Sequence, residues 1–237
     1  MTRISLLPAL AITCVFTTAA ADLTLSYDAP ASEWEQALPV GNGRLGAMVF
    51  GRAANERIQF NEHTVWTGQP HSYAHKGAWR HLETIRSLLT QGRQKEAEDL
   101  AMKEFMSVPI RQKAYQAFGD LLIEMKDLPA GAPTAYRRSL NLGDAVAVTE
   151  FSQGGATFRR EVFASHPAGV IVVRLTASRG KRLSFDATLM SAHAGSSVSS
   201  LPGPAVSMQG AVHDSAIRFE ARLTARAEGG TAESTDG

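Results

Sequence analysis

Residues 146–162 have the sequence VAVTEFSQGGATFRREV, and this stretch decides the fold. A run of strand-forming residues, Val146 to Phe151, precedes Gly154-Gly155, and a second run continues through Phe158 and Val162. Two glycines between such runs are a hairpin signal, because glycine adopts the positive φ that tight hairpin turns need. The stretch therefore predicts two antiparallel strands joined by a short turn.

Further strand-like runs recur from residue 118 onward and at residues 22–60, where Ile58 and Phe60 alternate with polar residues. The later runs are Leu121–Met125, Val170–Leu175, Leu183–Leu189 and Ile217–Leu223. Many short strands at regular spacing predict a mainly β chain that folds as an antiparallel sandwich. The nearly all-apolar run Val170–Leu175 predicts a central strand buried on both faces. Residues 194–204, rich in Gly, Ser and Pro, predict a surface loop.

Residues 78–106 interrupt the β pattern with two apolar stripes at helical spacing. The stripes, on either side of Gly92, are Trp79, Leu82, Ile85 and Leu89, and then Ala97, Leu100, Ala101 and Phe105. The pattern predicts a small helical hairpin inserted into the β chain. Such stripes normally pack against a core, so we expect the hairpin to cap one face of the sheet.

The two ends of the chain carry separate signals. Residues 1–21 combine the basic Arg3, the apolar run Ile4–Phe16 and small residues before a cleavage point, which is typical of a secretory signal peptide. We expect a secreted or periplasmic protein that is not associated with a membrane after cleavage, and a domain that spans residues 22–237. A lipoprotein anchored at Cys14 is a weaker alternative. A strand predicted at 231–235 and the Asp236-Gly237 turn have no return strand, so we expect a domain that is incomplete at its C-terminus.

The charge and several motifs exclude other functions. With 24 basic and 23 acidic residues and scattered basic pairs, the sequence predicts no nucleic-acid partner. Gly41–Gly46 matches the dinucleotide fingerprint, but no helix is expected after it, so no cofactor is predicted. His71 and His75 have metal-ligand spacing, yet Pro70 and neighbouring residues indicate a loop, and we predict no metal site. No G-x-S-x-G nucleophile elbow is present.

A glycosidase needs two carboxyl groups roughly 5–10 Å apart across a sugar. The sequence alone pairs none of its candidates, which are Glu33, Glu35, Glu56, Glu62, Asp120 and Asp144. The densest polar and aromatic stretch is Asn61–Gly68. Trp66 could stack on a sugar, with Asn61 and Glu62 bonding its hydroxyls, or the three could lie at a domain interface. Burial of Trp66 in the core is the alternative.

Six segments together resemble the N-terminal domain of glycoside hydrolase family 95, in order and spacing, across nearly all of residues 23–237. They are Tyr27–Ala31 with Trp34-Glu35, Ala37–Met48, Glu56–Glu62, Tyr115–Leu121, Tyr136–Leu142 and Arg160–Pro167. The resemblance implies a β-supersandwich followed by an (α/α)₆ barrel. It also implies an inverting α-L-fucosidase whose acid Glu and water-activating Asp lie in that barrel. His63 departs from the family pattern, which has Asp there.

The resemblance implies no catalytic residue in this stretch, no cofactor, and a fucosylated oligosaccharide or glycan as the substrate of the missing barrel. We therefore expect the domain alone to be inactive and to pack on that barrel. Two other functions stay open, a stand-alone carbohydrate-binding module and a purely structural β-sandwich domain.

Overall fold

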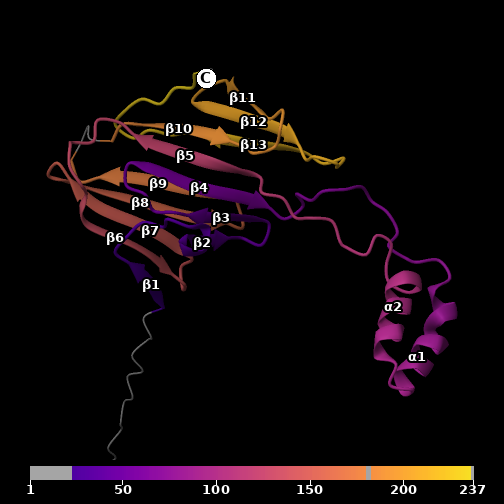
Figure 1. Cartoon of the computed structure of the whole chain (residues 1–237). Helices are drawn as coiled ribbons and strands as arrows, with labels where there is room; N and C mark the ends of the chain where they lie inside the picture. Colours follow the sequence, from indigo (N-terminus) through magenta and orange to yellow (C-terminus); the bar gives the residue numbers. More distant parts are fainter. Residues whose placement is uncertain (1–22, 180–182, 236–237) are drawn as a thin grey trace, which may run out of the picture.

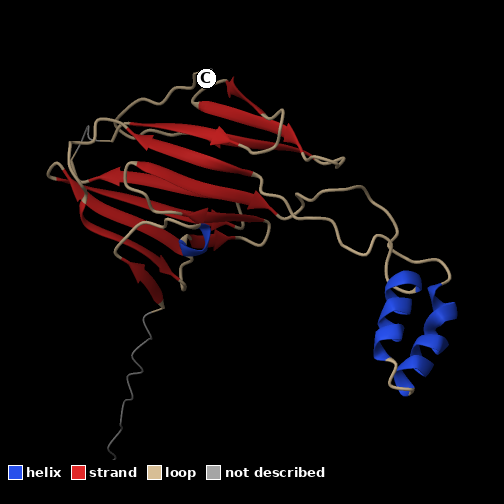
Figure 2. Ribbon diagram, viewed as in Figure 1, coloured by secondary structure: helices blue, strands red, loops and turns tan. Residues whose placement is uncertain are grey.

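A computed structural model describes residues 23–179 and 183–235; the predicted signal peptide and the Asp236-Gly237 turn lie outside these residues. Within the described residues the chain forms three antiparallel sheets, from which a pair of helices projects (Figures 1 and 2). Across the same residues, none of the helices combines the length and the apolarity that crossing a bilayer requires.

The first sheet has the strand order β1-β6-β7-β8-β9. Its strands are β1 (Thr24–Tyr27), β6 (Thr134–Asn141), β7 (Val146–Gln153), β8 (Ala156–Ser165) and β9 (Val170–Ala177). Phe151 of β7 lies opposite Phe158 of β8, and Gly154 and Gly155 between them have φ of 58° and 73°. The predicted hairpin is therefore confirmed, and its turn uses the backbone freedom of glycine.

The second sheet has the order β10-β5-β4-β3-β2, and the third has the order β11-β12-β13. Strands of the second sheet are β2 (Leu38–Gly41), β3 (Leu45–Val49), β4 (Asn55–Glu62), β5 (Gly119–Met125) and β10 (Phe185–Met190). Those of the third are β11 (Ser197–Leu201), β12 (Ala205–Ala211) and β13 (Arg218–Thr224). A short 3₁₀ helix, η1 (Trp34–Gln36), precedes β2.

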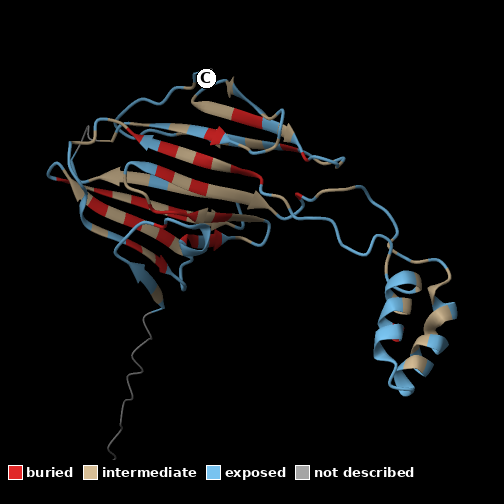
Figure 3. Cartoon of the chain, in the orientation of Figure 1, coloured by how far each residue is buried: buried red, intermediate tan, exposed pale blue. Residues whose placement is uncertain are grey.

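The core lies between the sheets. Ile58 of β4 and Val162 of β8 are almost fully buried in one apolar cluster, which Met208 of β12 and Phe219 of β13 join from the third sheet. Buried and partly exposed residues alternate along these strands, as in half-buried sheets (Figure 3). The predicted fold class, an antiparallel β-sandwich with a small helical insertion, is confirmed.

Three local predictions are wrong. β9 is an edge strand without a single fully buried residue, because the apolar run contains Arg174 and has a neighbouring strand on one side only. Ser197–Leu201 forms β11 inside the predicted loop, since its backbone pairs with β12, which local composition does not reveal. Residues 231–235 are not a strand.

The helical hairpin exists as predicted, but its position differs. It consists of η2 (Ala78–His81), α1 (Leu82–Thr90) and α2 (Gln94–Glu104), with Gly92 at φ 73° between the helices. The pair stands away from the sheets (Figures 1 and 2), and the two helices contact each other. Ala97 is the one buried residue of α1 and α2, and Trp79 is 72% exposed. The expectation that the hairpin caps a sheet is therefore wrong, because its narrow stripes are used between the helices.

One ion pair links the two large sheets through the core. Arg160 of β8 bonds Glu56 of β4, and these side chains are 3% and 0% exposed. Glu56 also accepts hydrogen bonds from the backbone N–H groups of Gly51, at 2.9 Å, and Arg57, at 3.0 Å. Burial raises the pKa of the Glu56 carboxyl, and the charge of Arg160 and both N–H groups oppose that rise.

The turn after β3 depends on the same region. Gly51 has φ 76°, and a Cβ there would lie 2.8 Å from the Tyr136 hydroxyl oxygen and 2.9 Å from Cδ of Arg138. Tyr136 donates a hydrogen bond to the Gly51 carbonyl, and burial raises the pKa of Tyr136 to about 12. The turn therefore requires glycine for its φ and for the close approach of both side chains.

Arg160→Met is expected to destabilise the domain by about 3–5 kcal/mol, because Glu56 is left as an unpaired buried charge. The neighbouring Arg159 is the matched control, since its side chain is 42% exposed and pairs with Glu150 and Glu161 at the surface. Arg159→Met should cost about 0–1 kcal/mol. Urea unfolding of both variants measures the difference. Equal losses would contradict the role of the pair, and the double variant Glu56→Leu, Arg160→Met should recover stability relative to Arg160→Met.

Candidate functional site

The candidate site lies on the two segments that connect the sandwich to the helical hairpin. We call residues 63–77 and 105–118 the neck; they run from β4 to η2 and from α2 back to β5. The segments lie side by side (Figure 1), joined by hydrogen bonds from Thr67 N–H to Ala114 O at 2.9 Å and from Val108 N–H to Tyr73 O at 3.1 Å. These cross-links fix the neck at both ends, so side chains on it have defined positions.

Trp66 lies where the two segments pair. Its indole Nε1–H donates to the His63 carbonyl at 2.8 Å, and its ring centroid is 5.1 Å from that of Tyr115. Trp66 is nevertheless 40% exposed and Tyr115 47% exposed, so Trp66 is not a core residue. An aromatic ring that is held in place and exposed is suited to contact a ligand or another domain.

Glu62 and Asn61 support this arrangement from the end of β4. Glu62 Oε1 accepts from Arg44 Nε at 3.1 Å, and Oε2 accepts from the Thr64 N–H at 2.8 Å. Asn61 Nδ2 donates to the Gln116 carbonyl at 3.1 Å, across the base of the neck. Both side chains are therefore engaged in positioning the neck, and their predicted bonds to sugar hydroxyls stay a prediction.

The electrostatics of Glu62 follow from these contacts. Partial burial acts to raise the pKa of its carboxyl, but the hydrogen bonds from Thr64 and Arg44 outweigh burial and hold this pKa below its usual value. Burial raises the pKa of the Tyr115 hydroxyl, and the negative charge of Glu62 raises it further by a smaller amount. Glu62 is thus a stable anion in the folded chain and unsuited to act as a general acid.

A shallow cleft of about 270 Å³ opens beside Trp66 and is lined by Trp66, Tyr73, Gln112 and Lys113. This volume is slightly below the roughly 300–1,000 Å³ of pockets for drug-sized ligands, so it suits one ring of a ligand. Its lining contains aromatic faces, an amide and a cation but no carboxyl group. The four lining residues include no Asp or Glu and so do not supply the acid and base that glycoside cleavage needs.

The sequence identified Trp66 but missed the other three lining residues. Gln112 and Lys113 follow the helical insertion, and no motif marks them. Their place beside Trp66 depends on hydrogen bonds between Thr67 and Ala114, which are 47 residues apart in the sequence: the Thr67 N–H donates to the Ala114 carbonyl, and the Ala114 N–H donates to the Thr67 hydroxyl. Local patterns carry no signal for such a pairing.

Two further sequence candidates, Asp120 and the glycine-rich motif Gly41–Gly46, have structural roles. Asp120 accepts two hydrogen bonds from Arg57, at 2.8 and 3.1 Å, beside the buried Glu56 pair. Gly41 ends β2 and Leu45 begins β3, so the glycine-rich motif forms a strand-to-strand turn and lacks the helix that a dinucleotide site requires.

The histidine pair lies on the neck. His71 Nδ1 is 2.9 Å from the Gln69 carbonyl, and His75 Nδ1 is 3.0 Å from the Met106 carbonyl. Across residues 23–179 and 183–235, no three His, Cys, Asp or Glu side chains are grouped so that they could hold a metal ion.

Comparison with known proteins supplies a family context. The model of the N-terminal domain of glycosyl hydrolase family 65 matches residues 25–237. Alpha-L-fucosidase 2 of Arabidopsis thaliana is 38% identical over 164 residues, which are 69% of this chain and 19% of that protein. Probable alpha-fucosidase A of Aspergillus niger is 33% identical over 149 residues, 60% of this chain and 18% of that protein. The chain spans about a fifth of the length of these relatives.

Glu62→Gln is expected to lower stability near neutral pH and to remove part of the acid dependence of unfolding. Because the folded-state pKa of Glu62 lies below the reference 4.5, its contribution is complete above that value and is lost as pH falls through the folded pKa. The difference in urea midpoint between wild type and variant should therefore shrink between about pH 6 and pH 3. Glu33→Gln, at an exposed carboxylate, is the control. A pH-independent difference for Glu62→Gln would refute this role.

Proposed function

Because the chain belongs to the family of glycosyl hydrolase family 65 N-terminal domains, we propose that it is the N-terminal β-sandwich domain of a secreted or periplasmic α-L-fucosidase. In this proposal the enzyme removes terminal fucose from glycans with inversion, and its catalytic carboxyl groups lie outside these 237 residues. The domain packs on the catalytic part and presents the Trp66 cleft at the rim of the active site.

The expected kinship with the N-terminal domains of fucosidase-type glycoside hydrolases is confirmed by the family match and by the two relatives. The assignment to glycoside hydrolase family 95 itself stays a prediction. Fucose specificity rests on the names of the relatives, and export rests on the features of residues 1–21.

The composition of the cleft is the observation that carries the proposal. Trp66 and Tyr73 present rings for a sugar to lie against, while no Asp or Glu lines the same cleft. Glu62, the nearest sequence candidate, is held as an anion by Arg44 and Thr64. A surface that can contact a sugar without protonating its leaving oxygen fits a domain that assists cleavage performed elsewhere.

A stand-alone carbohydrate-binding module is the second candidate. The paired and exposed rings of Trp66 and Tyr115 favour it, because sugar-binding modules act through exposed aromatic faces. Substitution of Trp66 distinguishes the two functions. In an enzyme domain it changes turnover, whereas in a stand-alone module it changes only the retention of the chain on a glycan.

The 237-residue chain on its own is expected to release no chromophore from a chromogenic α-L-fucoside, because its cleft has no carboxyl pair. The assay compares the chain with buffer and with the longer enzyme under identical conditions. Turnover that Glu62→Gln or Asp120→Asn abolishes would place catalysis in this domain and overturn the proposal.

Trp66→Ala, made in the longer enzyme, is expected to raise KM for a fucosylated oligosaccharide roughly 2- to 10-fold, from the loss of about 0.5–1.5 kcal/mol of ring contact. Trp34→Ala is the matched control, because Trp34 is 52% exposed but lies on η1, away from the neck. Unchanged KM and kcat for Trp66→Ala would leave the domain a purely structural role.

A further inference from the structure

We propose that the Trp66 cleft prefers an anionic pyranose, a sugar ring bearing a carboxylate or a sulfate group, whose charge is bound by Lys113. The inference deepens the proposed function, since it rests on contact between Trp66 and a sugar and adds the chemical class of that sugar. It is carried by the position of Lys113, its lack of an ion-pair partner, and the charge of the neck.

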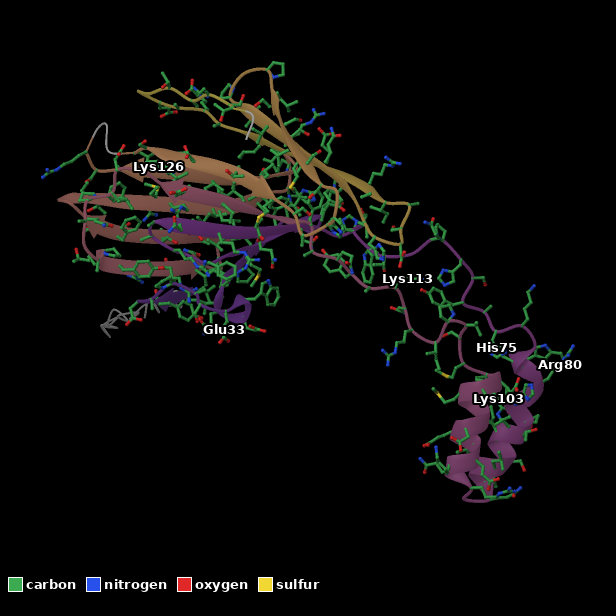
Figure 4. All side chains as sticks on the ribbon, turned by 45° about the horizontal axis from the view of Figure 1, so that its top comes forward. Glu33, His75, Arg80, Lys103, Lys113 and Lys126 are labelled. Atoms are coloured by element: carbon green, nitrogen blue, oxygen red, sulfur yellow. The ribbon has the colours of Figure 1, made fainter. Side chains whose placement is uncertain are left out.

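Lys113 is held against the backbone of the opposite segment. A Cβ at Gly68 would lie 2.4 Å from Cε and 2.5 Å from Cδ of Lys113, so the lysine stem lies directly on the bare glycine. Gly68 has φ 87°, and its N–H donates to the Asp214 carbonyl at 2.8 Å, which fixes it in turn. Packing of the stem limits the freedom of the side chain. Lys113 lies on the neck (Figure 4) and is one of the residues that line the cleft.

The ammonium group of Lys113 is free to take an external anion. Among the described residues Lys113 forms no ion pair, whereas Lys95, Lys103 and Lys126 each have a carboxylate partner within about 3 Å. Gln112 adds an amide on the same wall of the cleft. An ammonium ion and an amide together supply the donors that a carboxylate or sulfate group accepts.

The whole neck carries one sign of charge. Residues 63–77 and 105–118 contain Lys76, Arg111 and Lys113 and no Asp or Glu, although the complete chain has nearly equal numbers of basic and acidic residues. The acids that border the neck at its sandwich end are paired, Glu62 with Arg44 and Asp120 with Arg57. A cleft bordered by one sign of charge attracts ligands of the opposite sign.

Asp214 is the acid that approaches from the neighbouring loop. It contacts Gly68 through its backbone carbonyl, and its side chain lies 3.2 Å from His213 Nε2. Both side chains are largely exposed, at 80% and 88%. Its carboxylate is therefore turned toward His213 and does not pair with Lys113.

The aromatic lining selects a sugar over a simple anion. Tyr73 packs against His71, with ring centroids 4.2 Å apart, and Trp66 packs against Tyr115. Trp66 and Tyr73 line the same cleft as Lys113, so a ring that packs against them shares the cleft with this lysine side chain. This combination of fixed apolar faces and one cation fits a charged pyranose.

The test is binding by the 237-residue chain, followed by tryptophan fluorescence and by calorimetry at low salt. Trigalacturonate is compared with its methyl ester, and galactose 6-sulfate is compared with galactose. Within each pair the anionic sugar carries a charge that its match lacks; the first pair tests recognition of a carboxylate, and the second tests recognition of a sulfate group. We expect at least one anionic sugar to bind roughly 10-fold more tightly than its neutral match, and this preference to fall as salt is added.

Three variants locate the preference. Lys113→Gln should abolish it while binding of the neutral sugar is retained, and Trp66→Ala should weaken binding of both sugars. Lys126→Gln removes the same charge from the strand region far from the neck (Figure 4) and should change nothing. Circular dichroism and urea midpoints equal to those of wild type establish that each variant is folded.

The inference is overturned if neither anionic sugar is preferred, if Lys113→Gln retains the preference, or if a single-stranded thymidine oligonucleotide of equal charge binds as tightly. Loss of binding in Trp66→Ala without any effect of Lys113→Gln would reject the anionic preference and leave sugar contact intact. The KM of Trp66→Ala in the longer enzyme tests the proposed function separately.

Discussion

The buried pair of Glu56 and Arg160 is the contact on which the rest of the structure depends. Apolar packing between the sheets is non-directional and tolerates small shifts, whereas a charge that is fully removed from water requires its partner at one position. The pair therefore fixes β4 of one sheet against β8 of the other. Glu56 also accepts the Gly51 N–H, so the same contact holds the turn that leads from β3 into β4.

The position of β4 determines where the neck begins. β4 ends at Glu62, and the antiparallel register of Phe60 with Gly119 brings the start of β5 alongside it. The two segments of the neck consequently leave the sandwich as neighbours, and Asn61 joins them through the Gln116 carbonyl. A cleft assembled from residues far apart in sequence thus rests on the registration of two adjacent core strands.

Local chemistry explains which parts of this structure could be predicted. Gly154-Gly155 specifies its hairpin through φ alone, and the periodicity around Gly92 specifies two helices, since both signals lie within a few residues. Strand order is not local, which is why β9 could be recognised as a strand but not as an edge strand. An apolar stripe shows that one face of a helix packs against something, but it does not identify the element it packs against. In this hairpin each helix packs against the other helix.

The residues of the candidate site also differ in whether local sequence patterns could predict them. The sequence singles out Trp66 because polar and aromatic residues surround it along the chain. Lys113 has no distinctive sequence neighbours, and only its packing against Gly68 in the structure places it at the candidate site. A glycine at position 68 has no side chain to contribute, yet its open surface determines where the lysine stem can lie.

Charge is distributed differently in the two parts of the molecule. In the sandwich, two arginines form ion pairs with acids on other strands, Arg57 with Asp120 and Arg160 with Glu56. In the neck the basic side chains lie in a segment without acids. A nearly neutral chain can therefore present a locally cationic surface, because the potential at a cleft depends on the charges around it more than on the net charge. These two pairs tie strands of the sandwich together, whereas among the described residues Lys113 of the neck forms no ion pair within the fold.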